Sequence, residues 1–405
     1  MALRSKIDLM EATRLTRQGR LEEAMAILRD GLSGAPSGDA PEDANQRGRP
    51  FVDLVPPSAA TGDAWTAPSR GEAGSVKSSG PARAPTGSWL DGLMDFARDR
   101  VPGALSTITR EAPVAPRAGR FEDRSFSNAA GRRSYKLYIP ASFDGQPLPL
   151  LVMLHGCTQS PEDFAAGTRM NALAEEHTFL VAYPAQSREA NGSGCWNWFN
   201  AADQRRDRGE PSLIAGITRE IMAEFPVDPA RVFAAGLSAG GATAAIMGAT
   251  YPDLFRAVGV HSGLACGAAR DVQSAFAAMR HGSPAAPRGD GQAVPTIVFH
   301  GDRDNTVHPL NGDQVAAQVV AHVAGEAKAE GGLDTKVTTG EAPGGVGFTR
   351  KVHSDESGRS LLEQWVLHGV GHAWSGGSPS GSYTEPRGPD ASREMVRFFL
   401  ESAPA

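Results

Sequence analysis

From residue 119 onward, short apolar segments with the length of β-strands alternate with stretches of helical periodicity. Residues 148–154 (Leu-Pro-Leu-Leu-Val-Met-Leu) form a continuous apolar run, which is typical of a strand covered on both faces. This alternation predicts an α/β domain with a mostly parallel sheet and helices on both faces. Ligands of such sheets bind outside the carboxyl ends of the strands. We therefore expect the functional residues where the strands end.

The pattern predicts the following elements within this domain. Strands are expected over residues 134–139 (at an edge of the sheet), 148–154, 179–183, 231–235, 257–260, 296–299, 348–353 and 360–367, the last two as a hairpin. Helices are expected over residues 161–177, 211–225, 240–251, 311–324 and 390–401, the last with Asp390 as its N-cap.

The N-terminal 118 residues differ in composition from the rest of the chain. Residues 1–33 carry two apolar stripes at helical spacing and predict a single helical hairpin, which we expect to dock on a partner. Residues 34–118 are rich in Gly, Pro, Ser and Ala and predict a disordered, low-complexity linker, with one short amphipathic helix near residues 88–98. Residues 119–405 form the α/β domain.

Composition narrows the function classes. The net charge of −6 argues against a nucleic-acid partner, which a basic face would hold. No apolar run is long enough to span a membrane. The N-terminus lacks the apolar core of a signal peptide, so we expect a cytoplasmic protein.

The chain has three cysteines, Cys157, Cys195 and Cys266. An odd and sparse set favours reduced thiols, although one disulfide between two of them remains an alternative.

The segment Gly236-Leu-Ser-Ala-Gly240 follows the predicted strand 231–235 and precedes a predicted helix. A nucleophile elbow needs small neighbours, because its serine lies on a tight, strained turn between strand and helix. Ala239, Gly240 and Gly241 meet that requirement. The pattern therefore predicts Ser238 as a nucleophile, and the N-terminus of the helix favours the negative charge that develops there.

Two further strand ends carry residues that could activate a serine. Asp302 and Asp304 follow strand 296–299, and either could hold an imidazole in its productive tautomer. His372 lies in a loop after strand 360–367, with His368 as a rival. The order Ser, acid, His along the chain is the order expected for a hydrolase with a nucleophile elbow.

Residues 154–159 (Leu-His-Gly-Cys-Thr-Gln) lie at a fourth strand end. A loop there can supply a backbone N–H to an oxyanion, together with the N–H of Ala239. Cys157 as a nucleophile is a weaker alternative, because it has no elbow. Three tryptophans in Gly-rich loops, Trp196, Trp198 and Trp374, are predicted to line a substrate wall. No metal-binding or nucleotide-binding motif occurs, so we predict no metal and no cofactor.

Taken together, these segments resemble the polyhydroxybutyrate (PHB) depolymerase-type esterase family, which is related to feruloyl and acetylxylan esterases. The resemblance covers residues 120–400 and rests on residues 154–159, 236–241, 300–307 and 371–377 (Gly-His-Ala-Trp-Ser-Gly-Gly). It implies an α/β-hydrolase fold. It also implies Ser238 as nucleophile, His372 as general base, Asp304 as the acid, and the backbone N–H groups of Cys157 and Ala239 as the oxyanion hole.

The resemblance further implies a serine carboxylic-ester hydrolase that forms an acyl-enzyme and acts on hydroxyalkanoate esters or oligomers. Feruloyl or acetylxylan ester hydrolysis is the alternative within the same chemistry. A granule-binding or partner-binding scaffold with a vestigial hydrolase domain is the alternative of another class. An extracellular location, as for secreted members of the family, is the alternative to the cytoplasm.

Overall fold

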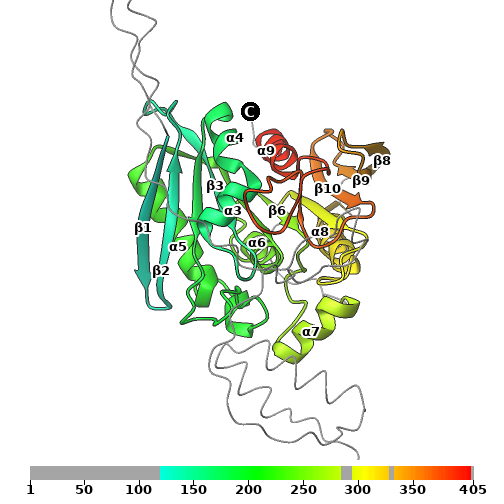
Figure 1. The fold of residues 1–405 in the computed structure, drawn as a ribbon, viewed down its shortest axis with the longest axis horizontal. Coiled ribbons are helices and arrows are strands. Elements are labelled where there is room, and N and C mark those ends of the chain that lie inside the picture. Colours follow the sequence, from blue (N-terminus) through cyan, green and yellow to red (C-terminus); the bar gives the residue numbers. More distant parts are fainter. Residues whose placement is uncertain (1–118, 284–293, 328–332, 403–405) are drawn as a thin grey trace, which may run out of the picture. The chain divides into compact units, whose positions relative to one another are not determined.

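The computed structural model describes residues 119–283, 294–327 and 333–402. The predicted hairpin over residues 1–33 and the linker over 34–118 lie outside these residues. Within them, ten strands form one sheet in the order β1-β2-β4-β3-β5-β6-β7-β10-β9-β8, which runs from left to right in Figure 1. Its neighbours from β4 to β10 pair in parallel, and antiparallel strands flank them on both sides.

The strands of this sheet are β1 (Arg120–Asn128), β2 (Gly131–Ile139), β3 (Leu148–Leu154), β4 (Leu180–Pro184), β5 (Val227–Leu237), β6 (Ala257–His261), β7 (Thr296–Gly301), β8 (Asp334–Glu341), β9 (Gly347–Ser354) and β10 (Ser360–Leu367). Two short strands, β11 (Trp374–Ser375) and β12 (Thr384–Glu385), pair with each other beyond the end of β10. The helices are α3 (Pro161–Thr168), α4 (Met170–His177), α5 (Gly209–Glu224), α6 (Ala239–Thr250), α7 (Val272–His281), α8 (Leu310–Ala327) and α9 (Ala391–Ser402), with a 3₁₀ turn, η2 (Ala201–Gln204).

Helices cover both faces of the sheet because successive side chains of a buried strand point in opposite directions. In β3, Leu150 and Val152 pack with apolar residues of α5 and α6. Leu151 and Met153 pack on the other face with residues of α3, α4 and α9. The prediction of a mostly parallel sheet between two helical layers is confirmed. None of the described helices is long and apolar enough to cross a membrane.

Several predicted elements differ in detail from the structure. The predicted edge strand lies inside the sheet as β2, because β1 pairs with its outer side. The predicted helix over residues 161–177 is two helices, broken at Arg169, whose φ is +54°. Strand β8 lacks an apolar pattern, since all of its residues are exposed, and the sequence reasoning missed it. The predicted N-cap of α9 is confirmed, since the Asp390 side chain accepts a hydrogen bond from Arg393 N at 3.0 Å.

Candidate active site

Ser238 lies between β5 and α6 in a strained backbone conformation, with φ +58° and ψ −120°. Glycine on either side allows this turn to approach the end of β3. A Cβ atom on Gly240 would lie 2.0 Å from the Leu154 carbonyl oxygen, and one on Gly236 would lie 2.6 Å from the same atom. Ala239, the next residue, is the first of α6, where backbone N–H groups have no partner within the helix. The predicted elbow geometry is therefore present.

The predicted acid and base lie in direct contact. His372 Nδ1 is 2.7 Å from Asp304 Oδ2, and the Asp304 side chain is fully buried. The other carboxylate oxygen of Asp304 accepts hydrogen bonds from the backbone N–H groups of Thr306 and Val307, at 2.9 and 2.8 Å. An ionised carboxylate can only accept a hydrogen bond, so the His372 Nδ1 atom carries a hydrogen and donates it to Asp304. The His372 Nε2 atom is then the proton acceptor of the ring.

The surroundings of Asp304 keep it ionised. Burial by itself would raise its pKa, but hydrogen bonding to His300 and His372 outweighs burial and holds the pKa of this carboxyl well below its usual range. His300 Nε2 lies 3.5 Å from Asp304 Oδ2 and donates its stronger hydrogen bond to the Val307 carbonyl, at 2.8 Å. Asp304 can therefore stabilise a positively charged His372.

The two rival residues form a pair of their own at the surface. His368 Nδ1 lies 3.1 Å from Asp302 Oδ2, and about half of the His368 side chain is exposed. His368 Nε2 lies 3.0 Å from the hydroxyl of Thr349 in β9, so both ring nitrogens have polar neighbours. Of the two histidine–aspartate pairs, only Asp304–His372 is sheltered from water.

His261, which the sequence reasoning did not single out, connects the elbow to the segment that bears His372. Its carbonyl oxygen accepts from Ser238 N at 2.9 Å, and its Nε2 accepts from Ser375 N at 3.0 Å. Its ring stacks on Trp374 at 5.0 Å. Burial lowers the pKa of His261 well below its usual range, so the ring is neutral, as an acceptor must be. Its position at the end of β6 is the signal that could have identified it.

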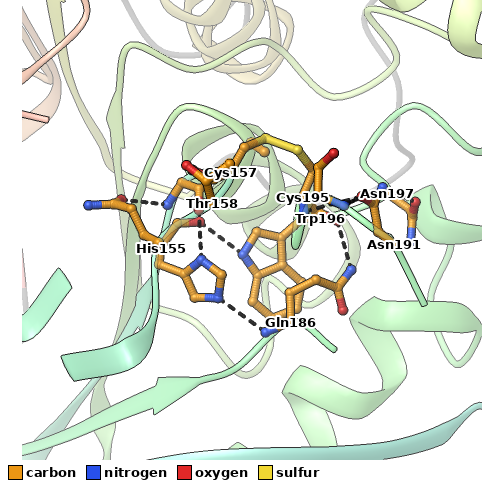
Figure 2. The surroundings of a disulfide bond; sticks show 12 residues. His155, Cys157, Thr158, Gln186, Asn191, Cys195, Trp196 and Asn197 are labelled. Atoms are coloured by element: carbon orange, nitrogen blue, oxygen red, sulfur yellow. Dashed lines mark hydrogen bonds between the residues drawn. A yellow bond between two sulfur atoms is a disulfide. The ribbon is translucent and has the colours of Figure 1, made fainter. Parts of the chain in front are cut away.

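The loop after β3 lies beside the nucleophile. A Cβ atom built on Gly156 would lie 3.6 Å from Ser238 Cβ. The next residue, Cys157, forms a disulfide with Cys195, which is 38 residues away in sequence (Figure 2). The expectation of reduced thiols is wrong for this pair. Its partners meet because two loops approach each other in the folded protein, which spacing alone does not reveal, and Cys266 is buried elsewhere.

Hydrogen bonds join the same two loops beneath the disulfide (Figure 2). Trp196 Nε1 donates to the His155 carbonyl oxygen at 3.0 Å. Gln186 donates from its backbone N–H to His155 Nε2 at 3.1 Å and from its side chain to the Cys195 carbonyl oxygen at 2.9 Å. The backbone at Gly156 and Cys157 is therefore held from below by several contacts.

A buried carboxylate, Glu210, lies under this arrangement. It accepts hydrogen bonds from Asn197 N at 2.7 Å, from Asn197 Nδ2 at 2.8 Å and from the Gln186 side chain. Arg133 Nη2 lies 3.4 Å away. Burial, and next the nearby charge of Asp203, raise the pKa of Glu210 to about 7, although the hydrogen bonds from Gln186 and Asn197 and the charge of Arg133 act in the opposite direction.

The three tryptophans predicted as a substrate wall are inside the protein. Trp196 and Trp374 are 0% and 1% exposed, and Trp198 is 6% exposed. Trp196 is bonded under the loop after β3, and Trp374 packs between His261 and Phe164 and donates its Nε1 hydrogen to Ser392. The Gly-rich loops therefore bring these large side chains inward. Trp196 and Trp374 contact residues next to the candidate site from the interior of the protein. Across the described ranges, no cluster of three or more His, Cys, Asp or Glu side chains is arranged to hold a metal ion.

Comparisons with known proteins identify a family and several relatives of this chain. Residues 133–342, more than half of the chain, match the family described as Esterase PHB depolymerase. Poly(3-hydroxyalkanoate) depolymerase C of Paucimonas lemoignei is 32% identical over 260 residues, which cover 61% of this chain and 60% of the relative. A feruloyl esterase B of Thermothelomyces thermophilus is 27% identical over 254 residues, which cover 58% of this chain and 82% of the relative.

Other relatives carry acetylxylan esterase names. A probable acetylxylan esterase A of Aspergillus clavatus is 28% identical over 228 residues, covering 52% of this chain and 73% of the relative. The solved structure of an acetyl xylan esterase from Aspergillus awamori superposes with a TM-score of 0.54 at 20% identity, covering 70% of this chain and all of that chain. At that identity the likeness concerns the fold alone. The chain belongs to the Esterase PHB depolymerase family and has the α/β-hydrolase fold that its sequence predicted.

Proposed function

We propose that this protein hydrolyses carboxylic esters through Ser238, His372 and Asp304. The observation that carries the proposal is the buried hydrogen bond between His372 Nδ1 and Asp304 Oδ2 at 2.7 Å. This pair lies in a member of an esterase family. His261 links Ser238, which it contacts through its carbonyl oxygen, to Ser375 in the segment after His372, which it contacts through its ring Nε2. The relatives named as esterases support the same class of reaction.

The reaction proceeds in two steps. His372 Nε2 takes the proton from Ser238 Oγ, which attacks the ester carbonyl carbon and forms a tetrahedral oxyanion. The bond to the alcohol oxygen then breaks, and His372 returns the proton to the departing alcohol. In the second step His372 deprotonates water, whose oxygen attacks the acyl carbonyl carbon. The bond between that carbon and Ser238 Oγ then breaks, His372 returns the proton to Oγ, and the carboxylic acid leaves.

The backbone N–H groups of Cys157 and Ala239 are the proposed oxyanion donors. Ala239 N–H stands at the first position of α6, and Cys157 follows Gly156, which lies beside Ser238. Preorganised donors of this kind stabilise the transition state by roughly 3 kcal/mol each. The Cys157–Cys195 disulfide and the Trp196 hydrogen bond keep the loop from relaxing away from the developing charge.

Replacing Ser238 with Ala tests the mechanism directly. We expect Ser238→Ala to lose hydrolysis of p-nitrophenyl acetate to the level of the uncatalysed reaction, because no other nucleophile lies at the elbow. The matched control is Ser142→Ala, at an exposed serine between β2 and β3. Initial rates of p-nitrophenol release measure both variants. Substantial activity in Ser238→Ala would contradict the proposed nucleophile.

The proposed substrates are hydroxyalkanoate esters or their oligomers, as the name of the Paucimonas relative suggests. This chain spans about 60% of that relative's length, so the substrate is part of the proposal. Feruloyl and acetylxylan esters are the second candidates, because relatives with those names match comparable shares of the chain. A panel of hydroxybutyrate oligomers, methyl ferulate and acetylated xylan, run on wild type and Ser238→Ala, distinguishes the three.

A scaffold with an inactive hydrolase domain is the candidate of another class. In that case the hairpin expected over residues 1–33 would be the docking element, and Ser238 would not react with a fluorophosphonate probe. We expect labelling of the wild type at Ser238, because the buried Asp304–His372 pair is intact. Absence of labelling in folded protein would favour the scaffold.

The disulfide between Cys157 and Cys195 is informative about the cellular location of the protein. Cytosolic glutathione keeps most thiols reduced, whereas disulfides persist in secreted and periplasmic proteins. The Cys157–Cys195 bond therefore supports the extracellular alternative over the cytoplasm. Fractionation of expressing cells, with mass spectrometry of the cysteine peptides, tests this assignment.

A further inference from the structure

One aromatic side chain near the candidate site faces solvent while its backbone is fixed on both sides. Tyr383 is 47% exposed and is one of three exposed large apolar residues among those that the structure describes, with Leu310 and Val337. Its φ is +52°, an unfavourable value for an aromatic residue. Such strain persists only where the surroundings enforce it, and it clusters at functional sites.

The Tyr383 side chain and backbone connect the two loops that flank the nucleophile. Its hydroxyl lies 3.1 Å from the Thr158 hydroxyl, and Thr158 directly follows Cys157. Its carbonyl oxygen accepts a hydrogen bond from Trp374 N at 2.7 Å, two residues after His372. The ring therefore stands between the oxyanion loop and the segment of the general base.

The neighbours of Tyr383 are anchored to α3. Ser382 donates from its N–H and its hydroxyl to the two carboxylate oxygens of Asp163, at 2.9 and 2.6 Å. A Cβ atom on Gly381 would lie 2.4 Å from the Asp163 carbonyl oxygen, so the backbone is pressed against the helix. Gln159 donates to the Ser382 carbonyl oxygen at 3.2 Å and accepts from Gly156 N at 2.9 Å.

We propose that the exposed ring of Tyr383 binds the organic group of the ester substrate, on the outer side of the loop that carries Cys157. The ligand class is an ester whose acyl or alcohol part contains an aromatic or aliphatic ring. A tyrosine offers such a group a rigid, flat apolar surface with only two side-chain torsions to restrict. Trp196, Trp198 and Trp374 are buried and do not offer such a surface. The inference rests on the ester hydrolysis proposed above.

Three small esters test the proposal. Methyl acetate has no ring, benzyl acetate has a ring in its alcohol part, and methyl phenylacetate has a ring in its acyl part. Tyr383→Asn removes the ring, and Asn tolerates the left-handed backbone. We expect kcat/KM for at least one ring-bearing ester to fall about tenfold more than for methyl acetate, mainly through KM, because the contact between the Tyr383 ring and the ring of the substrate is lost.

Two further variants make the result specific. Tyr383→Phe keeps the ring but loses the bond to Thr158, and we expect it to retain the wild-type ratio between the esters within about twofold. Val337→Ala, at an exposed position of β8, is the matched control for loss of surface apolar area. An equal loss on all three esters, or the same loss in Tyr383→Phe as in Tyr383→Asn, would overturn the proposal. Wild type inactive on every ester would instead contradict the proposed function.

Discussion

Asp302 and Asp304 are two residues apart, yet their side chains enter different environments. Asp304 turns into the protein and meets His372, and Asp302 remains at the surface with His368. From the residues alone, either carboxylate could serve as the acid, and only the family resemblance favoured Asp304. Burial explains the difference, because a hydrogen bond between a carboxylate and an imidazole is strongest where water does not compete.

Replacing the two aspartates in parallel measures this difference. We expect Asp304→Asn to lower kcat on p-nitrophenyl acetate on the order of 10³-fold to 10⁴-fold, since the amide favours the wrong tautomer of His372. Asp302→Asn is the matched control and should stay within about twofold of wild type, because surface ion pairs contribute little. Steady-state kinetics at pH 8 reports both. Similar losses in the two variants would refute the assignment of the acid.

At the scale of elements, the loop after β3 owes its position to partners from other parts of the chain. Trp196 and Cys195 come from the loop after β4, and Glu210 comes from the first turn of α5. The motif around Cys157 predicted a loop beside Ser238, which the structure has, but not the residues that hold the loop there. These residues hold the loop through contacts between segments that are distant along the chain. Such contacts cannot be predicted from the pattern of a single sequence.

The disulfide contributes to stability as well as to loop position. A cross-link that closes a loop of this length restricts the unfolded chain and stabilises the fold by about 4 kcal/mol. We expect the free energy of unfolding of the double variant Cys157→Ser/Cys195→Ser to be about 4 kcal/mol lower than that of wild type. We also expect a lower kcat. Urea denaturation with and without reductant provides the measurement and its control. Reductant should destabilise the wild type and leave the double variant unchanged; wild type insensitive to full reduction would contradict this role.

At the scale of the whole molecule, the central parallel strands and most of the helices beside them followed from apolar runs and helical periodicity, whereas α7 was not predicted. The flanking strands were harder to predict. Strand β8 is exposed throughout, and in β1 the polar residues Glu122 and Arg124 take partly buried positions, so neither strand shows an apolar alternation in its sequence. The same reasoning explains which residues of the candidate site could be predicted from the sequence. Ser238, Asp304 and His372 follow strand ends in recognisable motifs, whereas His261 has no motif, and Trp196, Trp198 and Trp374 were assigned to the wrong side of their loops.

Glu210 makes global stability depend on pH. Its folded-state pKa of about 7 lies above the value of 4.5 expected for the unfolded chain. The folded protein therefore binds the proton more tightly, and this contribution is complete below pH 4.5 and lost as pH rises through 7. The difference corresponds to about 3 kcal/mol.

Replacing Glu210 with Gln isolates that contribution. We expect the free energy of unfolding of Glu210→Gln, measured by urea denaturation between pH 5 and pH 8, to fall less steeply with pH than that of wild type. Glu224→Gln, at the exposed end of α5, is the control and should keep the wild-type slope. An unchanged slope in Glu210→Gln would show that another group causes the pH dependence.

The inward orientation of the loop tryptophans has a consequence for how such enzymes diverge. Because Trp196 and Trp374 pack inside the protein, the exposed positions on the neighbouring loops, such as Thr158, lie outside the apolar core. Mutations there can accumulate without unfolding the protein or displacing the reacting groups. Descendants of one ancestor can thus acquire new preferences among esters through a few surface changes, while the chemistry is inherited intact.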